Sequence, residues 1–328
     1  MYQNRFLKEV FITFLSLFFL TSYVIAATFP EKPLTLIVPT APGGPIDLTA
    51  RIISKQLAVE LGQAIVVINR PGASQKIGVD SLINSPKDGY TIAAVSPASM
   101  TINPVLDKNV GYDSVNDLTH LINAIEYQSV LVTRPSIPAK NLADFVAYAR
   151  KNPGKLSYGS GGGGTSMHFT TSAFLNLAKI NALHLPYKSS GPAMLGLLGS
   201  EIDFLMPDLG DIKSYIIGGQ VTALAISGKT RSKVLPNIPT FSESNIPELK
   251  NWNYTGWIGI VAPAGIPVDV SNKLQAALQA TMMSESVKES FDNIGFKVVA
   301  TPGDQFKKLI QEDLTLNRKI VKEGNITK

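Results

Sequence analysis

Short apolar runs alternate with amphipathic stretches along much of the chain, and this pattern predicts an α/β fold. Near the start, the run 34–38 is followed by apolar residues at helical spacing as far as Gly62, and the run 65–68 is typical of a buried strand. A short helix over 76–84 and a strand over 90–95 follow. Because crossover connections are right-handed, we expect these first three strands to be parallel.

The same alternation restarts in the middle of the chain, after a mainly apolar stretch over 118–133 that we interpret as a segment crossing between two domains. Beyond Pro135, a helix is predicted over 141–151 with Asn141 as its cap. The elements predicted next are strands over 156–158, 182–185, 202–206 and 221–226, with helices after Thr165 and from Pro192. These elements indicate a second α/β unit.

The last part of the chain is predicted to return to the first unit. The run 257–261 is typical of a late strand, and helices are predicted over about 268–283 and 305–322. The first domain would therefore be discontinuous. We expect it to comprise residues 27–126 and 252–328, with residues 127–251 forming the second domain.

The first 26 residues have the pattern of a secretory signal peptide. Basic residues precede an apolar run over 10–20, and small residues end at Ala26. The apolar run is shorter than the roughly 20 residues that a membrane-spanning helix needs. We therefore expect cleavage near Ala26 and a periplasmic mature protein, which agrees with the absence of cysteine.

Composition narrows the classes of function. The chain has 328 residues, 45% of them hydrophobic, so it can bury a substantial core. Its net charge is +5, but the basic residues are scattered, which argues against nucleic acid as a partner and favours small anions. The three histidines, His120, His168 and His184, lack metal-ligand spacing, so we expect no metal and no cofactor.

Two glycine-rich turns, over 42–47 and 159–166, carry the candidate chemistry. Each follows a predicted strand and opens a predicted helix. Glycine lets bare backbone N–H groups approach a ligand, and a helix N-terminus adds partial positive charge. Two such turns could hold one small carboxylate or phosphate between them, although each turn could also be purely structural.

Enzymatic alternatives are weaker. Gly159, Gly161 and Gly164 match a dinucleotide-binding pattern, but no acidic residue lies about 20 residues further on. Ser166 and His168 suggest a hydrolase, but side chains two residues apart on a helix do not face each other, and no nucleophile-elbow motif surrounds Ser166. An exported α/β enzyme acting on an organic acid remains the alternative to a binding protein.

A series of short motifs, in this order and spacing, resembles the substrate-binding proteins of tripartite tricarboxylate transporters, also called Bug receptors. The motifs are Phe-Pro-Glu-Lys-Pro at 29–33, Val-Pro at 38–39, Pro-Gly-Gly at 42–44, Asn-Arg-Pro-Gly-Ala at 69–73, Asp-Gly-Tyr-Thr at 88–91, Ile-Asn-Pro at 102–104, Pro-Gly-Lys-Leu at 153–156, Gly-Thr-Ser-Met-His at 164–168, Pro-Tyr-Lys at 186–188 and Ala-Pro-Ala-Gly at 262–265. The resemblance covers essentially the whole chain after the signal peptide.

The resemblance implies a two-domain periplasmic binding protein of type II-like architecture, whose domains are joined by crossing strands and close on a ligand. It implies a non-catalytic receptor that captures a small mono- or dicarboxylate and delivers it to the permease subunits of such a transporter. We expect it to act as a monomer. A sensory subunit with the same binding chemistry is a further alternative that the sequence does not separate.

In this family the carboxylate is typically held by backbone N–H groups and ordered water, at positions that map onto the turns 42–47 and 161–166. Several residues depart from the family pattern. Thr40 stands where many relatives carry an aromatic residue, Ser-Gln-Lys at 74–76 replaces a common Gly-Gly-Asn, and Asp208 follows Pro207 where many relatives have Asp-Asn. Asp208 could favour a ligand that bears an amine, or it could cap the next helix.

Ser96 and Ser99 follow the third predicted strand at its carboxyl end, where open α/β sheets bind ligands. The candidate ligand-binding residues are therefore Thr40, Pro42, Gly43, Gly44, Asp47, Ser96, Ser99, Gly161, Gly164, Thr165, Ser166 and Asp208. Because the two turns belong to different predicted domains, ligand binding should close one domain on the other. We expect the hinge near 125–128 and 251–254.

Overall fold

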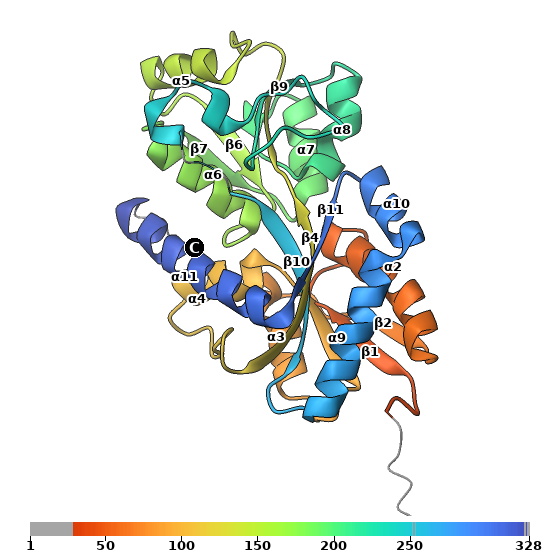
Figure 1. The fold of residues 1–328 in the computed structure, drawn as a ribbon. Helices are drawn as coiled ribbons and strands as arrows, with labels where there is room; N and C mark the ends of the chain where they lie inside the picture. The colour runs from red at the N-terminus through yellow and green to blue at the C-terminus, as the bar shows by residue number, and fades with distance from the viewer. Residues whose placement is uncertain (1–28, 251, 253, 325, 327–328) are drawn as a thin grey trace, which may run out of the picture. The chain divides into compact units, whose positions relative to one another are not determined.

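The computed structural model describes residues 29–250, 252, 254–324 and 326. The predicted signal peptide lies outside the described residues, among which no helix is long and apolar enough to cross a membrane. From Lys32 onward the chain forms one unit with two sheets, each covered by helices (Figure 1). We call each sheet with its covering helices a lobe.

The first lobe is built on a six-stranded mixed sheet with the order β11-β4-β10-β3-β1-β2. Its strands are β1 (Leu34–Val38), β2 (Ile65–Asn69), β3 (Thr91–Val95), β4 (Leu118–Tyr127), β10 (Gly256–Pro263) and β11 (Lys297–Pro302). Strand β1 pairs in parallel with β2 and β3, as the crossover rule predicted. Strand β10 is antiparallel to both β3 and β4, which brings the end of the chain back into this sheet.

Helices cover both faces of this sheet. They are α2 (Pro45–Leu61), α3 (Lys76–Ile83), α9 (Val268–Met283), α10 (Glu285–Asn293) and α11 (Gly303–Gly324), with the short α4 (Asn103–Leu106) beside them. Helices α2 and α9 pack together on one face. Helices α3 and α11 bury Val79, Leu82, Phe306 and Ile310 against the other face, around Trp257.

The second lobe is built on a five-stranded sheet with the order β7-β6-β8-β5-β9. Its elements are β5 (Val130–Thr133), α5 (Leu142–Lys151), β6 (Ser157–Ser160), α6 (Ser166–Leu177), β7 (Leu183–Pro186), α7 (Ser190–Leu198), β8 (Phe204–Leu205), α8 (Leu209–Ile217) and β9 (Thr222–Ile226). Successive strand residues point to opposite faces. Leu131 and Phe204 accordingly pack with helices α5 and α6, whereas Val130, Val132 and Leu205 pack with α7 and α8.

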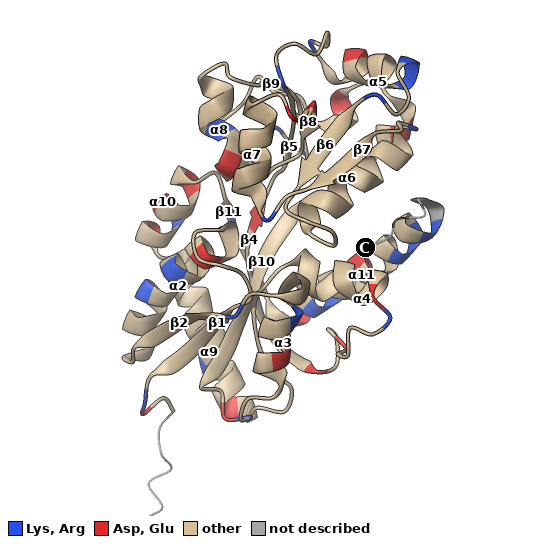
Figure 2. Ribbon diagram, turned by 180° about the vertical axis from the view of Figure 1, so that it is seen from behind, with Lys and Arg blue, Asp and Glu red and all other residues tan. Residues whose placement is uncertain are grey.

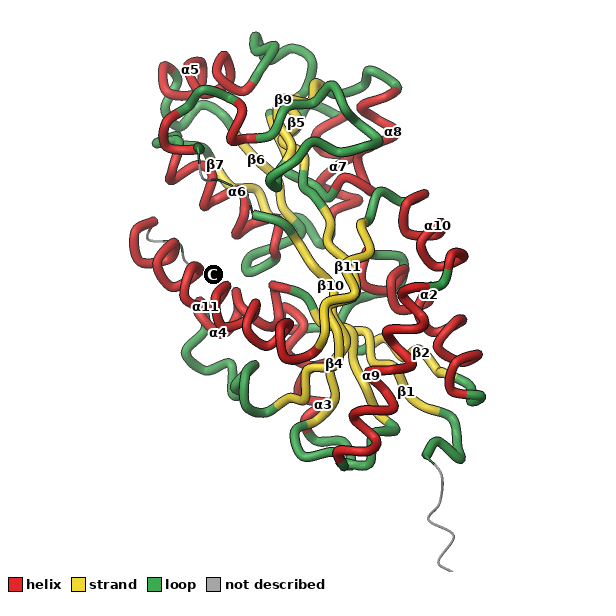
Figure 3. The backbone as a smooth tube through the Cα atoms, in the orientation of Figure 1, coloured by secondary structure: helices red, strands yellow, loops and turns green. Residues whose placement is uncertain are grey.

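The lobes are joined where β4 gives way to β5 and where the chain returns in β10 (Figure 3). Only Gln128 and Ser129 separate β4 from β5. The Gln128 amide donates hydrogen bonds to the carbonyls of Ser227 and Thr230, at 2.6 and 2.8 Å. Opposite this junction, a Cβ on Gly256 would lie 2.1 Å from the Tyr127 ring, so only glycine lets β10 pass this close.

Helix α11 takes part in both lobes. Phe306 and Ile310 are buried in the core of the first lobe, whereas Ile320 and Val321 pack against the core of the second. Between them, the buried Asn317 side chain donates to the carbonyl and hydroxyl oxygens of Thr101, at 3.2 and 3.1 Å. One continuous helix therefore links the two cores.

Several local predictions are confirmed in detail. Helix α9 has the predicted bounds, and Gly62 ends α2 with a left-handed φ of 65°. Asn141 caps α5 by accepting a hydrogen bond from the Asp144 amide at 2.8 Å. Helix α10 and strand β11 were not anticipated, and β11 pairs irregularly with β4 because its register shifts between Val298 and Thr301. How far each domain extends stays a prediction.

Truncating Phe306 should strongly destabilise the first lobe. Its side chain is fully buried and makes edge-to-face contacts with Trp257 and His120, at ring-centre distances of 5.1 and 5.8 Å. We expect Phe306→Ala to lower the free energy of unfolding by about 3–5 kcal/mol, measured by urea denaturation followed by tryptophan fluorescence.

The matched control for this prediction is Leu316→Ala on the same helix. The Leu316 side chain is 46% exposed, so its truncation should cost less than about 0.5 kcal/mol. Equal effects of the two substitutions would contradict the packing described for α11.

Candidate functional site

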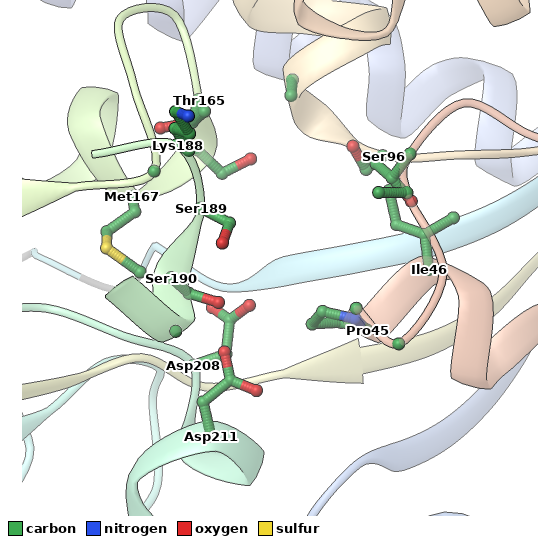
Figure 4. Close-up of a pocket in the computed structure, with 18 of the residues that line it drawn as sticks. Pro45, Ile46, Ser96, Thr165, Met167, Lys188, Ser189, Ser190, Asp208 and Asp211 are labelled. Carbon is green, nitrogen blue, oxygen red and sulfur yellow. The ribbon is translucent and has the colours of Figure 1, made fainter. Parts of the chain in front are cut away.

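A cavity of about 930 Å³ lies between the two lobes (Figure 4). We call it the cleft cavity. It is lined by Pro39, Thr40, Ala41, Pro42, Gly43, Gly44, Pro45, Ile46, Pro71, Gly72, Ser74, Gln75, Ser96, Ala98 and Tyr127, and by Gly161, Gly164, Thr165, Ser166, Met167, Lys188, Ser189, Ser190, Gly191, Pro192, Met194, Leu195, Asp208, Asp211 and Tyr215. Both glycine-rich turns are represented in this lining, so the structure brings them together around one space.

The first turn is held from behind by Asp47, which is 2% exposed. Its carboxylate accepts hydrogen bonds from the Gly43 amide at 3.0 Å, from Arg51 at 2.9 Å and from Asn69 at 2.9 Å. Burial alone would raise the pKa of Asp47, but these hydrogen bonds outweigh burial and hold the pKa below its usual value. Asn69 also donates to the Thr40 carbonyl at 2.9 Å, so the turn is fixed at two points.

This bracing decides which backbone donors face the cavity. The Gly43 amide is engaged by Asp47, and Pro45 has no N–H group. The amides of the first turn of α2 have no partner within the helix, and the positive end of the helix dipole adds to them. An anion in the cleft cavity would therefore meet the amides of Gly44 and Ile46 rather than that of Gly43.

The second turn is held by its own side chains. The Ser160 hydroxyl accepts a hydrogen bond from the Gly162 amide at 3.1 Å, and the Thr165 hydroxyl donates to the Gly162 carbonyl at 2.8 Å. Thr165 also caps helix α6 by accepting from the His168 amide at 3.3 Å. Gly162 and Gly164 have left-handed φ values of 112° and 75°, which explains why glycine is used here.

Two stacked histidines, His168 and His184, hold the second turn through hydrogen bonds with Gly164 and Ser160. The rings of His168 and His184 lie 4.3 Å apart, and His168 Nδ1 accepts a hydrogen bond from the Gly164 amide at 3.3 Å. Burial, followed by the neighbouring His184, lowers the pKa of His168 to about 4, so Nδ1 stays free to accept. His184 pairs with the Ser160 hydroxyl at 2.7 Å, but Ser160 is fully buried, so this serine–histidine pair supports the turn instead of facing the cavity.

The wall of the cleft cavity that α7 and α8 of the second lobe contribute is acidic. Figure 4 shows the carboxyl groups of Asp208 and Asp211 side by side with the Ser190 hydroxyl, facing the cavity. Burial, followed by the charge of Asp211, raises the pKa of Asp208 to about 8. Burial also raises the pKa of Asp211, and a hydrogen bond with Ser190 opposes this in part.

Of the twelve predicted ligand-binding residues, all but Asp47 and Ser99 line the cleft cavity. Asp47 lies behind the first turn, as described above. Ser99 is fully buried, and its hydroxyl accepts from the Ser96 amide at 3.3 Å and donates to the Ser96 carbonyl at 3.1 Å. Both residues therefore shape the loops that carry lining residues. Which lining residues contact a ligand stays a prediction.

Sequence reasoning missed several lining residues, above all the segment before α3. Ala73, Ser74 and Gln75 all adopt left-handed φ values, of 47°, 52° and 80°, where glycine would be unstrained. Gln75 accepts a hydrogen bond from the Ser96 hydroxyl at 3.0 Å, and the Ser74 hydroxyl reaches the Gly163 carbonyl of the other lobe at 3.3 Å. Asp211 and Ser190 were also missed, although each lies in the first turn of a helix beside the cavity.

Basic residues do not gather at the cleft cavity. Lys and Arg are spread over helices of both lobes, among them α2, α5, α10 and α11 (Figure 2). Within the described part of the chain, no group of three or more His, Asp or Glu side chains could hold a metal ion. The site therefore combines the two glycine-rich turns, one from each lobe, with two carboxyl groups from the start of α8.

Two α/β lobes that are joined by crossing strands and share a cleft cavity define a ligand-binding class of protein. The chain matches the family model described as "Tripartite tricarboxylate transporter family receptor" over residues 49–326. It belongs to this family, whose members are periplasmic solute-binding receptors, as the motifs in its sequence predicted. Family and fold both indicate a binding protein rather than an enzyme.

Relatives and solved structures agree with this assignment. Protein BugT of Bordetella pertussis is 31% identical over 302 residues, covering 92% of this chain and 91% of BugT. The periplasmic binding protein BugD matches with a TM-score of 0.82 and 28% identity, covering 91% of this chain and 99% of BugD. The predicted α/β, two-domain binding-protein fold is thereby confirmed.

Two of the solved structures contain organic acids. Rpa4515 of R. palustris, solved with adipate, matches with a TM-score of 0.84 and 27% identity, covering 91% of this chain and 99% of its own. MatC from Rhodopseudomonas palustris, solved with bound malate, matches with a TM-score of 0.81 and 25% identity, covering 89% of this chain and all of its own.

The acidic wall should make stability fall as the pH rises through neutrality. The Asp208 carboxyl keeps its proton up to about pH 8 in the native state, whereas its ordinary pKa is 3.8. Between these values the native state binds more protons than the unfolded state, so raising the pH favours unfolding. The pKa values of the buried histidines lie below their ordinary value of 6.5, so the histidines are neutral in the native state and almost entirely neutral in the unfolded state above pH 7.5. Above that pH the carboxyl groups dominate the change in stability.

We expect the empty protein to lose about 0.5–1 kcal/mol of unfolding free energy between pH 7.5 and 8.5, measured by urea denaturation. Asp208→Asn should flatten this profile. Asp269→Asn, an exposed residue in the first turn of α9, removes the same charge and should leave the profile unchanged. An unchanged profile in Asp208→Asn would show that Asp208 is ionised at neutral pH.

Proposed function

We propose that this protein is a periplasmic receptor that binds a small mono- or dicarboxylate and delivers it to the membrane permease of a tripartite tricarboxylate-type transporter. One observation carries the proposal. Two glycine-rich turns, from different sheets, open helices α2 and α6 at the same cavity. Helix N-termini with unpartnered amides are anion-binding sites.

The size of the cavity supports a small solute. Ligand pockets commonly measure about 300–1,000 Å³, and the cleft cavity falls within this range at about 930 Å³. Two solved relatives hold adipate and malate, which are small carboxylates. Backbone recognition reads only the carboxylate group, so the remaining lining residues must decide which acid is accepted.

In this proposal the ligand-binding residues are those of the two turns together with Thr40, Ser96 and Asp208. Residues 1–26 direct export and are removed near Ala26, and the mature monomer meets its permease in the periplasm. The mildly basic composition favours encounter with anions. A thermal-shift screen of the mature protein against mono- and dicarboxylates, aromatic acids and amino acids should identify a stabilising acid.

Substitutions in the first turn should separate ligand contact from backbone strain. Gly44 has an ordinary φ of −83°, and the space into which a side chain would project is open, so Gly44→Val should fold normally. If a carboxylate approaches the Gly44 amide, the valine side chain should weaken its binding at least tenfold, which is about 1.4 kcal/mol. Isothermal titration calorimetry with the acid found in the screen measures this loss.

Gly43→Ala and Gly219→Ala are the variants with which Gly44→Val is compared. Both glycines have positive φ values, of 90° and 68°, and open space around them, so each substitution should cost about 1 kcal/mol of stability. Only Gly43 belongs to the cleft cavity, so only its substitution should also affect binding. A Gly44→Val protein that binds normally would show that the first turn is only structural.

Ligand binding should close the lobes. An anion held by both turns touches both lobes at once, and the Ser74 hydroxyl already spans the gap to Gly163. We propose that the hinge lies near residues 125–128 and 251–254, of which 251 and 253 lie outside the described residues. Small-angle scattering should show a smaller radius of gyration with saturating ligand, and an unchanged radius with confirmed binding would count against closure.

A further inference from the structure

Asp208 occupies a helix-capping position without capping the helix. It is the N-cap residue of α8, where an aspartate normally accepts a hydrogen bond from an amide of the first turn. Its side chain makes no such bond. Instead, Oδ1 accepts a hydrogen bond from the Ser129 hydroxyl at 3.3 Å, and the carboxyl group faces the cleft cavity (Figure 4). Capping of α8 therefore does not explain the orientation of the Asp208 side chain.

A second carboxyl group and a hydroxyl converge on the same place. Asp211 lies three residues after Asp208 on α8, and Ser190 opens α7 from the neighbouring loop. Among the described residues, no ion pair involves either aspartate. Lys188 also lines the cavity, but Figure 4 shows it beside Thr165 and away from both carboxyl groups. Within the described chain, the acidic wall therefore lacks a cation from the protein.

Two neighbouring, partly buried carboxyl groups are unfavourable when both are ionised. Desolvation and mutual repulsion both oppose the charged forms, and this is the direction in which the pKa values of Asp208 and Asp211 move. A cation in the cavity would relieve both effects at once. An ammonium group offers three N–H donors, which matches two carboxylates and the Ser190 hydroxyl.

We propose that the cleft cavity selects an organic acid that also carries a positively charged amino group. The carboxylate is held by the amides of the two glycine-rich turns, and the ammonium group is held by Asp208, Asp211 and Ser190. This inference rests on the proposed function and names the class of acid. A second carboxylate at the acidic wall would instead face two carboxyl groups and bind only where they are protonated.

The test compares amino acids with the same acids lacking the amino group. Glutamate is paired with glutarate, and 4-aminobutyrate and 5-aminovalerate are paired with butyrate and valerate. Affinities are measured by isothermal titration calorimetry of the mature protein at pH 8.5, where Asp208 is mostly ionised and the amino groups of the ligands are still charged. We expect at least one amino acid to bind tenfold or more tightly than its counterpart.

Three variants assign the selectivity to the acidic wall. Asp208→Asn keeps the shape of the side chain and should weaken the amino acid at least tenfold while leaving the counterpart unchanged or tighter. Ser190→Ala should weaken the amino acid by a smaller factor. Asp269→Asn removes an exposed charge on α9 and should preserve the affinities of both ligands. Unfolding temperatures of the empty variants establish that each is folded.

Each outcome decides between the two proposals. Tighter binding of glutarate, butyrate or valerate than of the amino acids, with Asp208→Asn improving it, would overturn the inference and leave the carboxylate receptor intact. Selectivity for the amino acid that persists in Asp208→Asn would also overturn it. Failure of every carboxylate to bind the folded protein, in this panel and in the broader screen, would overturn the proposed function as well.

Discussion

The cleft cavity depends on hydrogen bonds that fix the backbone of its two glycine-rich turns. These bonds come from side chains on the side of each turn that faces away from the cavity. A turn that presents amides to a ligand must hold its other polar groups in fixed positions. Asp47 does this for the first turn by accepting from Gly43, Arg51 and Asn69. In the second turn the same task falls to Ser160, Thr165 and His168. Charged and titratable side chains thus act here as braces, while the surface offered to an anion is mostly main chain.

The cavity is lined by backbone amides at the two turns and by carboxyl side chains at the start of α8, and these two kinds of group suit different parts of a ligand. Main-chain amides recognise the carboxylate group common to all organic acids, so they give little selectivity among them. In the proposed binding mode, the side chains that α7 and α8 contribute to the cavity would face the remainder of the ligand. If the proposed binding mode holds, substitutions in α7 and α8 would change the preferred ligand without altering the two glycine-rich turns.

Much of the fold followed from the sequence because its signals were local. Capping by Asn141, the stop at Gly62 and the apolar run of β1 each depend on neighbouring residues. Strand β11 was harder to predict, because it is defined by pairing with β4, which lies more than 150 residues earlier, and its register shifts between Val298 and Thr301. Such long-range pairing leaves little trace in local periodicity.

For the site, the turns themselves were predictable, but the orientation of individual side chains was not. Asp47 and Asp208 were both predicted to be ligand-binding residues at the start of helices, yet Asp47 is buried behind its turn and Asp208 faces the cavity. Packing decides between these orientations, because Asn69 and Arg51 surround Asp47, whereas Asp208 has only Ser129. Serine and glutamine by themselves do not indicate the left-handed backbone of residues 73–75, and the glycines that relatives commonly carry at 74 and 75 were the available signal for it.

Helix α11 limits how the lobes can move. Its early part is fixed in one core by Phe306 and Ile310, and its later part packs on the other core through Ile320 and Val321. Wide separation of the lobes would strip apolar surface from one of these cores or bend the helix near Asn317. Twisting about an axis close to α11 would preserve both contacts. The helix thus acts as a strut, and it favours motions of the lobes that keep both of its ends packed.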